Sequence, residues 1–336
     1  MHNKKYLLLI LSSAAIFAFS IYFVIIRYPV DNYLMGYSDL GRSITLMKFY
    51  EKPKLSNKKN IYYWGPSFIK ESINANLLDN LLDANNYNLG NPASTPLRRI
   101  FELKPFLKLK PDIIVWGISY MSLSGKWLKP LDQYALISPY NKSCVNKIYR
   151  KDIASLLSYN DIDLLLYKRK FILSALFTGL RILSHKIFNK TPPLSYEKYN
   201  TDFKSQGILT QIKTNSDPKY LSELEKKHSF SEYAVPAYPN NEMKATEYII
   251  SSFISNNIKI IIINIPLHPS LLKLIPSDSK RNFDLFMSSI SRKYNVTILD
   301  YEGVFDKSDF YDGHHLNVNN IENFTKMVAN NIRRIL

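Results

Sequence analysis

Five short apolar runs recur along the chain, and stretches with helical spacing separate or follow them. The runs lie at residues 61–64, 87–89, 113–116, 258–265 and 296–299. The fourth run reads Ile-Lys-Ile-Ile-Ile-Ile-Asn-Ile, and β-branched residues of this kind favour strands. Strands that alternate with helices are typical of a parallel sheet covered on both faces. The sequence therefore predicts an α/β domain.

The predicted helices come from apolar residues that recur with a helical period. They lie at residues 43–50, 68–82, 95–107, 243–255, 282–294 and 319–336. Ligands of parallel sheets bind outside the carboxyl ends of the strands. Ser67, Ala93, Ser119 and His268 each follow a predicted strand, and we therefore expect them at the edge of the sheet where a site would lie.

Two stretches at opposite ends of the chain fit together as one active site. Gly65, Pro66 and Ser67 form a tight turn after the first run, and a serine in such a turn can act as a nucleophile if a base removes its proton. Near the other end, Asp312 precedes His315 by three residues. An aspartate at that spacing can reach the histidine ring and hold its tautomer and orientation. The chain thus contains the parts of a Ser-His-Asp triad.

Other interpretations of these residues stay open at this point. Ser67 is also suited to cap the following helix, and the Asp312 loop is also compatible with a purely structural role. His314 adjoins His315, but successive residues of an extended segment point opposite ways, so only one of them is expected to face Ser67. A metal site built from these residues is not expected, because no well-spaced third ligand set is evident. His268 either lines the mouth of the pocket or is an ordinary loop residue.

Four stretches of the chain resemble the sequence blocks of the SGNH (GDSL-like) hydrolase superfamily. They are the Ser67 turn and residues 88–93, 117–119 and 312–315. The resemblance covers roughly residues 58–125 and 242–336. It implies a flavodoxin-like three-layer α/β/α fold, with Ser67 as nucleophile, His315 as general base, Asp312 as its orienting carboxylate, and no cofactor.

The resemblance also implies which groups stabilise a developing oxyanion. The first donor would be the backbone N–H of Ser67. The second would be the backbone N–H of Ala93, where the family has glycine, and the third the side chain of Ser119, where the family usually has asparagine. Loss of one such donor can cost about 10²–10³ in rate. The shorter serine side chain therefore favours a specialised or transfer role over that of a general esterase.

Residues 6–26 form an uncharged run of 21 residues, and about 20 are needed to cross the hydrocarbon core as a helix. Lys4 and Lys5 precede the run, which favours a cytoplasmic N-terminus and an exported body. A cleaved signal peptide is the alternative, but the end of the run offers no small-residue cleavage site. The sequence predicts a single-pass anchor in the cell membrane.

The charge of the chain bears on whether it binds nucleic acid, and its cysteine content bears on export. The formal net charge is +16, but the lysines are spread along the chain and no nucleic-acid-binding motif is present. We therefore expect a solvated basic surface and no nucleic-acid partner. Cys144 is the only cysteine, so no internal disulfide can form, and the cysteine content neither supports nor excludes export.

The patterns divide the chain into five parts. They are an anchor at residues 1–27, a linker at 28–59, the first part of the α/β domain at 60–120, an inserted cap at 121–241, and the second part of the domain at 242–336. Within the cap the alternation fails. Residues 161–190 are largely apolar and predict one or two helices, so the insertion is expected to be mostly helical. A helix lying on the membrane or a face for a membrane partner is one alternative for this segment. A second membrane span is another, but residues 171–180 are too short before Arg181 to favour it.

Within the superfamily, the chain is similar to membrane-anchored members that work in O-acylation of cell-surface polymers. This similarity implies an exported enzyme that accepts an acyl group, expected to be acetyl, on Ser67. The enzyme would pass that group to a cell-surface polysaccharide or a teichoic-acid-like polymer, with a membrane-bound O-acyltransferase as donor. Esterase activity shares the same first half-reaction and stays open. A non-catalytic polymer-binding or scaffolding protein is the alternative of another class, because Ala93 and Ser119 depart from the family pattern.

Overall fold

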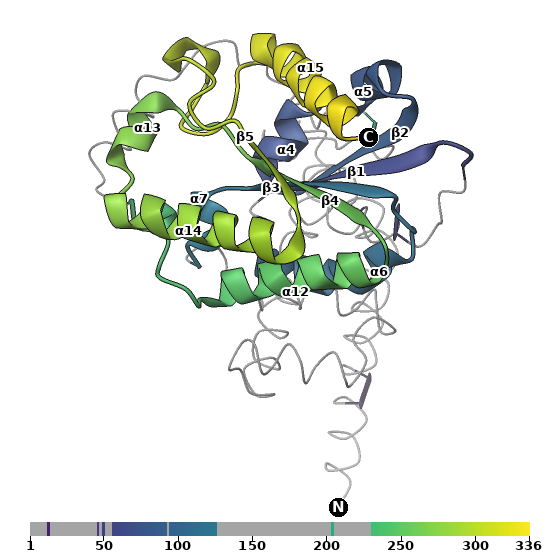
Figure 1. Cartoon of the computed structure of the whole chain (residues 1–336), viewed down its shortest axis with the longest axis horizontal. Helices are drawn as coiled ribbons and strands as arrows, with labels where there is room; N and C mark the ends of the chain where they lie inside the picture. Colours follow the sequence, from purple (N-terminus) through teal and green to yellow (C-terminus); the bar gives the residue numbers. More distant parts are fainter. Residues whose placement is uncertain are drawn as a thin grey trace, which may run out of the picture.

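A computed structural model describes residues 12–13, 46, 49–50, 56–92, 94–125, 203–204 and 230–336. At its centre is a five-stranded parallel sheet in the order β2-β1-β3-β4-β5 (Figure 1). The strands are β1 (Lys59–Gly65), β2 (Ala84–Gly90), β3 (Ile113–Ile118), β4 (Lys259–Asn264) and β5 (Thr297–Asp300). The prediction of an α/β domain with a parallel sheet is confirmed.

Helices cover both faces of the sheet (Figure 1). One face carries α4 (Ser67–Ser72), α5 (Ala75–Leu81) and α15 (Val318–Ile335). The other face carries α6 (Pro96–Leu107), α7 (Tyr120–Leu123), α12 (Asn241–Ser255) and α14 (Ser277–Tyr294). The short helix α13 (Pro269–Leu274) and the 3₁₀ turns Phe230–Tyr233 and Lys307–Asp309 complete the described elements.

Alternate residues of each central strand enter opposite layers of the core. Tyr62 and Trp64 of β1 pack with α6 and α12, whereas Ile61 and Tyr63 pack with α4, α5 and α15. All four side chains are fully buried. Burial on both faces explains why these strands read as continuous apolar runs, because neither face of a covered parallel sheet meets water.

The sheet joins the two ends of the sequence. β3 pairs with β4 over six residues, from Ile113 opposite Lys259 to Ile118 opposite Asn264. All strands run in one direction, so the segments that leave the carboxyl ends of β1, β2, β3 and β4 meet at one edge. That edge brings the Ser67 turn and the Asp312 loop within reach of each other.

Three helices differ from the sequence prediction. The helix predicted at 68–82 is two helices, because Ile73 is extended and the Asn74 side chain accepts a hydrogen bond from the backbone of Leu77 at 3.1 Å, which starts a new helix. The helix predicted at 282–294 starts earlier, at Ser277. Helix α13 was not predicted, although proline is common at the first position of a helix, where Pro269 lies.

Several predictions fall on residues outside the described ranges. They include the anchor apart from residues 12–13, most of the linker, and the cap apart from residues 121–125, 203–204 and 230–241. Among the described helices, none combines the length and the apolar character that a membrane span requires. Phe203 and Lys204 are described where they contact β2 and α5, with the Phe203 carbonyl accepting from the Asn88 backbone at 2.7 Å.

Candidate active site

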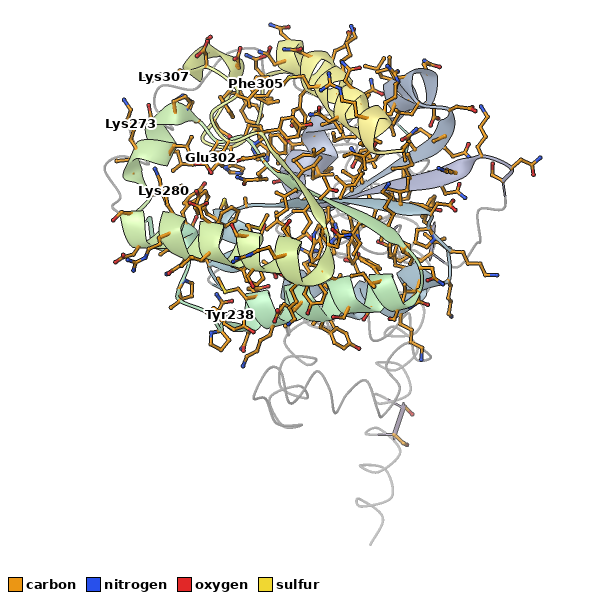
Figure 2. The ribbon with its side chains drawn as sticks, in the orientation of Figure 1. Tyr238, Lys273, Lys280, Glu302, Phe305 and Lys307 are labelled. Atoms are coloured by element: carbon orange, nitrogen blue, oxygen red, sulfur yellow. The ribbon has the colours of Figure 1, made fainter. Side chains whose placement is uncertain are left out.

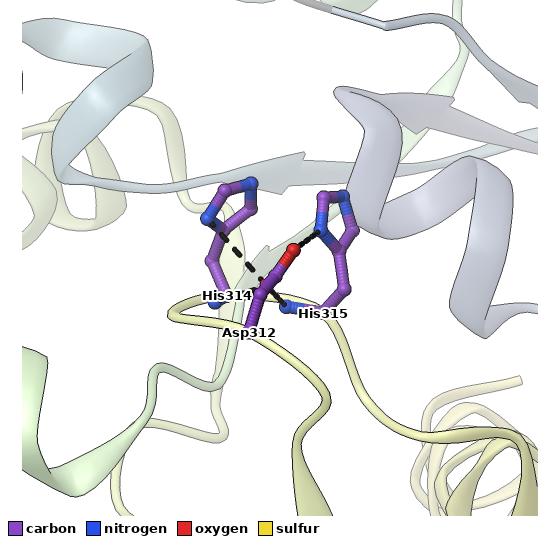
Figure 3. Close-up of side chains that lie close together, drawn as sticks. All are labelled: Asp312, His314 and His315. Atoms are coloured by element: carbon purple, nitrogen blue, oxygen red, sulfur yellow. Dashed lines mark hydrogen bonds and ion pairs between the residues drawn. The ribbon is translucent and has the colours of Figure 1, made fainter. Parts of the chain in front are cut away.

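Ser67, His315 and Asp312 form one hydrogen-bonded chain. His315 Nε2 lies 2.8 Å from Ser67 Oγ, and His315 Nδ1 lies 2.8 Å from Asp312 Oδ2. Figure 3 shows the Asp312 carboxylate beside the His315 ring. The serine comes from the first strand-to-helix turn, and the other two residues from the loop before the last helix. The structure therefore brings together the three residues that the sequence placed in one site.

Ser67 is the first residue of α4 and does not cap it. Pro66 occupies the N-cap position, and no side chain there accepts a hydrogen bond. Proline suits this place, because the helix start needs no N–H from it. The Ser67 hydroxyl is thus directed to His315, and its interpretation as an N-cap is wrong.

Close packing of α4 on the strand ends fixes the position of Ser67. Gly65 has φ +154°, a conformation that other residues rarely adopt. A Cβ atom on Gly90 would lie 2.2 Å from the backbone nitrogen of Lys70 in α4. The Asn88 side chain donates to three carbonyl groups at the end of α4, at 2.7–3.1 Å. These contacts hold the helix, and with it Ser67, against β1 and β2.

Arg99 holds the strand ends from the other face of the sheet. It is fully buried, and its Nη2 donates to the carbonyls of Gly65 at 2.8 Å and Leu89 at 3.0 Å. Glu102 neutralises it through a 2.5 Å contact, and the guanidinium lies over the Trp64 ring at 4.7 Å. A buried charge is tolerated when it is paired and hydrogen-bonded in this way. Arg99 therefore positions the turn that precedes Ser67.

Asp312 accepts hydrogen bonds through both of its oxygens. Oδ1 accepts the backbone N–H groups of His314 at 2.9 Å and His315 at 2.8 Å, which leaves Oδ2 for the His315 ring. Burial alone would raise the pKa of Asp312, but the two histidines and these hydrogen bonds hold the pKa well below its ordinary value. The carboxylate is therefore ionised at neutral pH, as an orienting partner of a histidine must be.

Tyr311 and Glu71 lie against His315. The Tyr311 ring stacks on His315 with ring centroids 5.4 Å apart, and its hydroxyl donates to Glu71 Oε2 at 3.1 Å. The same carboxylate oxygen lies 3.8 Å from His315 Nε2. A second carboxylate at this distance would stabilise the charged form of the histidine during proton transfer.

His314 also lies at the site, but among the described residues it forms no hydrogen bond with Ser67. Its Nδ1 lies 3.4 Å from the Tyr233 hydroxyl and 3.9 Å from Asp312 Oδ1. The centroids of the His314 and His315 rings are 4.1 Å apart (Figure 3). Burial lowers the pKa of His314 to about 4, and the neighbouring His315 adds to this effect. His314 is therefore neutral at pH 7.

His268 contacts the loop that carries Asp312 and does not line the cavity at Ser67. Its side chain is 1% exposed, and its Nδ1 accepts from the backbone of Ser270 at 3.1 Å, which caps α13. Its backbone N–H donates to the Gly313 carbonyl at 3.1 Å. These contacts favour a structural role for His268 over a place at the mouth of the pocket. Figure 2 labels Glu302, Phe305 and Lys307 on the segment that leads from β5 towards this loop.

A small cavity of about 30 Å³ opens beside Ser67. One part of its wall carries hydroxyl groups and the other part is apolar; the wall includes Ser94, Thr95, Ser119, Ser122, Phe68, Met121, Ile265 and His314. Ser119, which the resemblance implies as a third oxyanion donor, lines this cavity and is also the N-cap of α7. Ala93, the predicted second donor, lies outside the described residues.

Asp312, His314 and His315 could also hold a metal ion, because one ligand atom from each lies within 4.8 Å of the others. Two of these residues, Asp312 and His315, already use their ligand atoms in hydrogen bonds, however. Asp312 accepts from His315 and from two backbone N–H groups, and His315 Nε2 faces Ser67. Metal binding would break these bonds, so the geometry suits a triad better than a metal centre.

Several residues of the site were missed in the sequence. Glu71 lies four residues after Ser67, a spacing that places both on one helix face, and this signal could have found it. Tyr311 adjoins Asp312 but carries no motif of its own. Ser94 and Arg99 had no signal, because their roles depend on how α6 and the loop before it pack on the strand ends.

Comparison with known proteins adds one match. A model of an uncharacterised family matches residues 187–336, which is less than half of the chain. No curated protein matches the sequence. The matched range contains Asp312 and His315 and leaves out Ser67, so the family match alone does not identify a nucleophile.

Proposed function

We propose that the chain is an SGNH-like acyltransferase or esterase that works through a covalent acyl-serine. The observation that carries this proposal is the hydrogen-bonded chain from Ser67 through His315 to Asp312. A serine hydroxyl is a weak nucleophile unless a base is in contact with it. Here the base is held at 2.8 Å and is itself oriented by an ionised carboxylate.

The strand order supports the finer fold assignment. The order 2-1-3-4-5 is typical of flavodoxin-like sheets, whose sites lie where the order reverses, between the first and third strands. Ser67 follows β1 and Ser119 follows β3, so both residues flank this switch point. The flavodoxin-like three-layer architecture is also the one that the resemblance to SGNH hydrolases implies.

In the first half-reaction, Ser67 Oγ attacks the carbonyl carbon of an acyl ester or thioester while His315 Nε2 takes its proton. The carbonyl oxygen becomes an oxyanion, and the Asp312 carboxylate stabilises the imidazolium through Nδ1–H. The intermediate then collapses. The bond to the leaving group breaks, the leaving oxygen or sulfur takes the proton from His315, and the acyl group stays on Ser67.

In the second half-reaction, His315 removes a proton from an acceptor hydroxyl, whose oxygen attacks the acyl carbon. The Ser67–acyl bond breaks and the proton returns to Ser67 Oγ. A polymer hydroxyl as acceptor gives transfer, and water as acceptor gives hydrolysis. Both acceptors would use His315 as the base, which lies 2.8 Å from Ser67 Oγ.

The cavity supports a short acyl group. Its volume is about 30 Å³, and one water molecule needs roughly 10–15 Å³ measured in this way. An acetyl group fits such a space. We therefore propose acetyl as the transferred group.

The setting of the reaction comes from the sequence. A single-pass anchor at residues 1–27 with a cytoplasmic N-terminus would place the site on the outer side of the cell membrane. There it would receive the acetyl group from a membrane-bound O-acyltransferase and pass it to a cell-surface polysaccharide or a teichoic-acid-like polymer.

The proposal predicts a covalent adduct on Ser67. The full-length protein in detergent should react with a fluorophosphonate or with p-nitrophenyl acetate, and mass spectrometry should place the adduct on Ser67. Ser67→Ala should abolish labelling, and His315→Ala should slow it sharply because the hydroxyl alone is weakly nucleophilic. Asp312→Asn should lower the rate by up to about 10⁴, because the histidine then takes the wrong tautomer.

Two controls separate this proposal from other interpretations. Heat-denatured protein should not label, and prior treatment with EDTA should leave labelling unchanged, whereas a metal-dependent esterase would lose it. A folded protein that never labels at Ser67 would favour the scaffolding alternative, especially if polymer acetylation in cells survives Ser67→Ala.

A further inference from the structure

Ser94 has a buried hydroxyl that faces no hydrogen-bond partner among the described residues. Ser94 is only 5% exposed, and its Oγ atom is buried with no hydrogen-bond partner among the described residues. Leaving a buried hydroxyl unsatisfied destabilises a fold. Such a group in a native fold needs an explanation, and Ser94 lines the same cavity as Ser67.

The other hydroxyls of this wall already have hydrogen bonds. Ser119 and Ser122 form a reciprocal capping box at the start of α7, and their Oγ atoms lie 3.3 Å apart. Thr95 accepts from the backbone of Arg98 at 3.4 Å as the N-cap of α6. Of these four hydroxyl groups, that of Ser94 is the one with no hydrogen bond among the described residues, so both its donor and its acceptor capacity are left for a ligand in the cavity.

The loop that carries Ser94 is held at both ends. The backbone N–H of Asn91 donates to the Gly65 carbonyl at 2.9 Å, which ties the loop to the turn before Ser67. Arg98 donates to the Pro92 carbonyl, and Thr95 caps the next helix. A donor on a fixed loop needs little reorganisation when charge develops, which is the property that an oxyanion site requires.

We propose that the Ser94 hydroxyl donates a hydrogen bond to the acyl oxygen as the tetrahedral intermediate forms on Ser67. This inference rests on the proposed acyl transfer and adds to it. Ser94 supplies a side-chain donor whose hydroxyl has no competing hydrogen bond among the described residues, whereas the Ser119 hydroxyl is shared with that of Ser122. The same contact forms in both half-reactions, because each passes through an oxyanion on the same carbonyl.

The test compares Ser94→Ala with Ser72→Ala in the full-length protein. Ser72 is the matched control, because its Oγ is also buried without a partner among the described residues, and Ser72 does not line the cavity. With p-nitrophenyl acetate, Ser94→Ala should lower kcat for acylation and deacylation by roughly 10²-fold. KM should change little, since the contact strengthens only as the oxyanion forms. Ser72→Ala should keep the wild-type rate.

The outcomes separate this inference from the function on which it rests. If the wild type forms acetyl-Ser67 and Ser94→Ala forms and loses it at the same rate, the role of Ser94 is wrong and the proposed function stands. If the wild type forms no adduct on Ser67, both fail. Thermal unfolding shows whether the variant is folded. If Ser94→Ala does not fold, the near-isosteric Ser94→Cys, with its weaker donor, should show the same loss of kcat, and a wild-type kcat in this variant would overturn the proposal.

Discussion

At the scale of single residues, the Asp312 loop shows which parts of a site a sequence can reveal. Asp312 and His315 lie three residues apart, and the turn between them is built from backbone bonds to Asp312 Oδ1. Such a motif is local, so the spacing of the two residues in the sequence is enough to predict that their side chains are in contact. Tyr311 and Ser94 reach the site only through packing between distant elements, and their places could not be predicted because no local rule relates them to Ser67. Glu71 differs, because its spacing four residues after Ser67 on α4 could have revealed it.

His314 should make the stability of the fold depend on pH. Its pKa is lowered to about 4 by burial and by His315, from 6.5 in the unfolded chain. Between these values the unfolded state binds more protons than the folded state, so the free energy of unfolding falls as the pH falls from about 6.5 to about 4. His314→Gln removes this group. Urea unfolding at several pH values should show a shallower loss of stability in this range for the variant than for the wild type.

The same variant tests which histidine is the base. His314→Gln should reduce labelling of Ser67 far less than His315→Ala, because His315 is the ring at 2.8 Å from Ser67 Oγ. If His314→Gln is the more damaging change while the protein stays folded, the base has been assigned to the wrong residue. An unchanged pH profile of stability would instead contradict the buried, neutral state of His314.

At the scale of elements, the strands were predictable and one helix break was not. Strands β1, β3 and β4 are buried along almost their whole length, so their apolar composition identifies them, whereas β5 at the edge of the sheet is only partly buried. The break between α4 and α5 was missed because apolar residues continue with a helical period through Ile73, Leu77 and Leu81. What ends α4 is the contact of Asn88 in β2 with the carbonyls at its end and the capping by Asn74. The first of these depends on tertiary structure.

The start of α6 depends on a buried glutamate of α12. Glu242 Oε2 accepts from the backbone N–H of Leu97 at 2.8 Å and interacts with the Thr95 side chain, which lines the cavity. Burial raises the pKa of Glu242 to about 8, and these hydrogen bonds only partly oppose it. Glu242 therefore connects the packing of two helices with the wall of the candidate site.

Glu242→Gln should stabilise the protein at alkaline pH. The folded state keeps a proton that the unfolded state, with an ordinary pKa of 4.5, has lost. The contribution of Glu242 to stability is therefore complete below about pH 4.5 and is lost as the pH rises to about 8. Glutamine keeps an acceptor for Leu97 and has no proton to lose. The melting temperature of the variant should exceed that of the wild type at pH 8–9.

Glu247→Gln is the matched control for this experiment. Glu247 lies on the same helix and pairs with Lys293 at 2.9 Å, with the lysine half exposed. Solvent screens a pair with an exposed lysine, so the pair contributes little to stability and this change should not produce a gain at alkaline pH. A Glu242→Gln variant that is less stable than the wild type from pH 5 to pH 9 would contradict a protonated Glu242 in the native state.

At the scale of the whole molecule, one folded unit is made from the two ends of the chain. β1, β2 and β3 come from one segment, β4 and β5 from another, and the β3–β4 pairing closes the sheet. The alternation of strands and helices predicted this class of fold. The order of the strands did not follow from the sequence patterns alone, because apolar runs do not state which strand pairs with which.

Ser67 comes from the first segment of the sheet and its hydrogen-bond partner His315 from the second. Both segments must therefore lie on the same side of the membrane. The uncharged run at residues 6–26, after Lys4 and Lys5, predicts that this side is the outer one. Protease added to intact spheroplasts should digest residues 56–336, and the protein should stay with the membranes after an alkaline carbonate wash. A cytoplasmic marker protein should be digested only after lysis. Full protection in intact spheroplasts would reverse the topology, and release by the wash would show that the N-terminal run is cleaved. Either result would change where Ser67 could meet the acyl donor that we propose, and neither would alter the hydrogen bonds that join Ser67, His315 and Asp312.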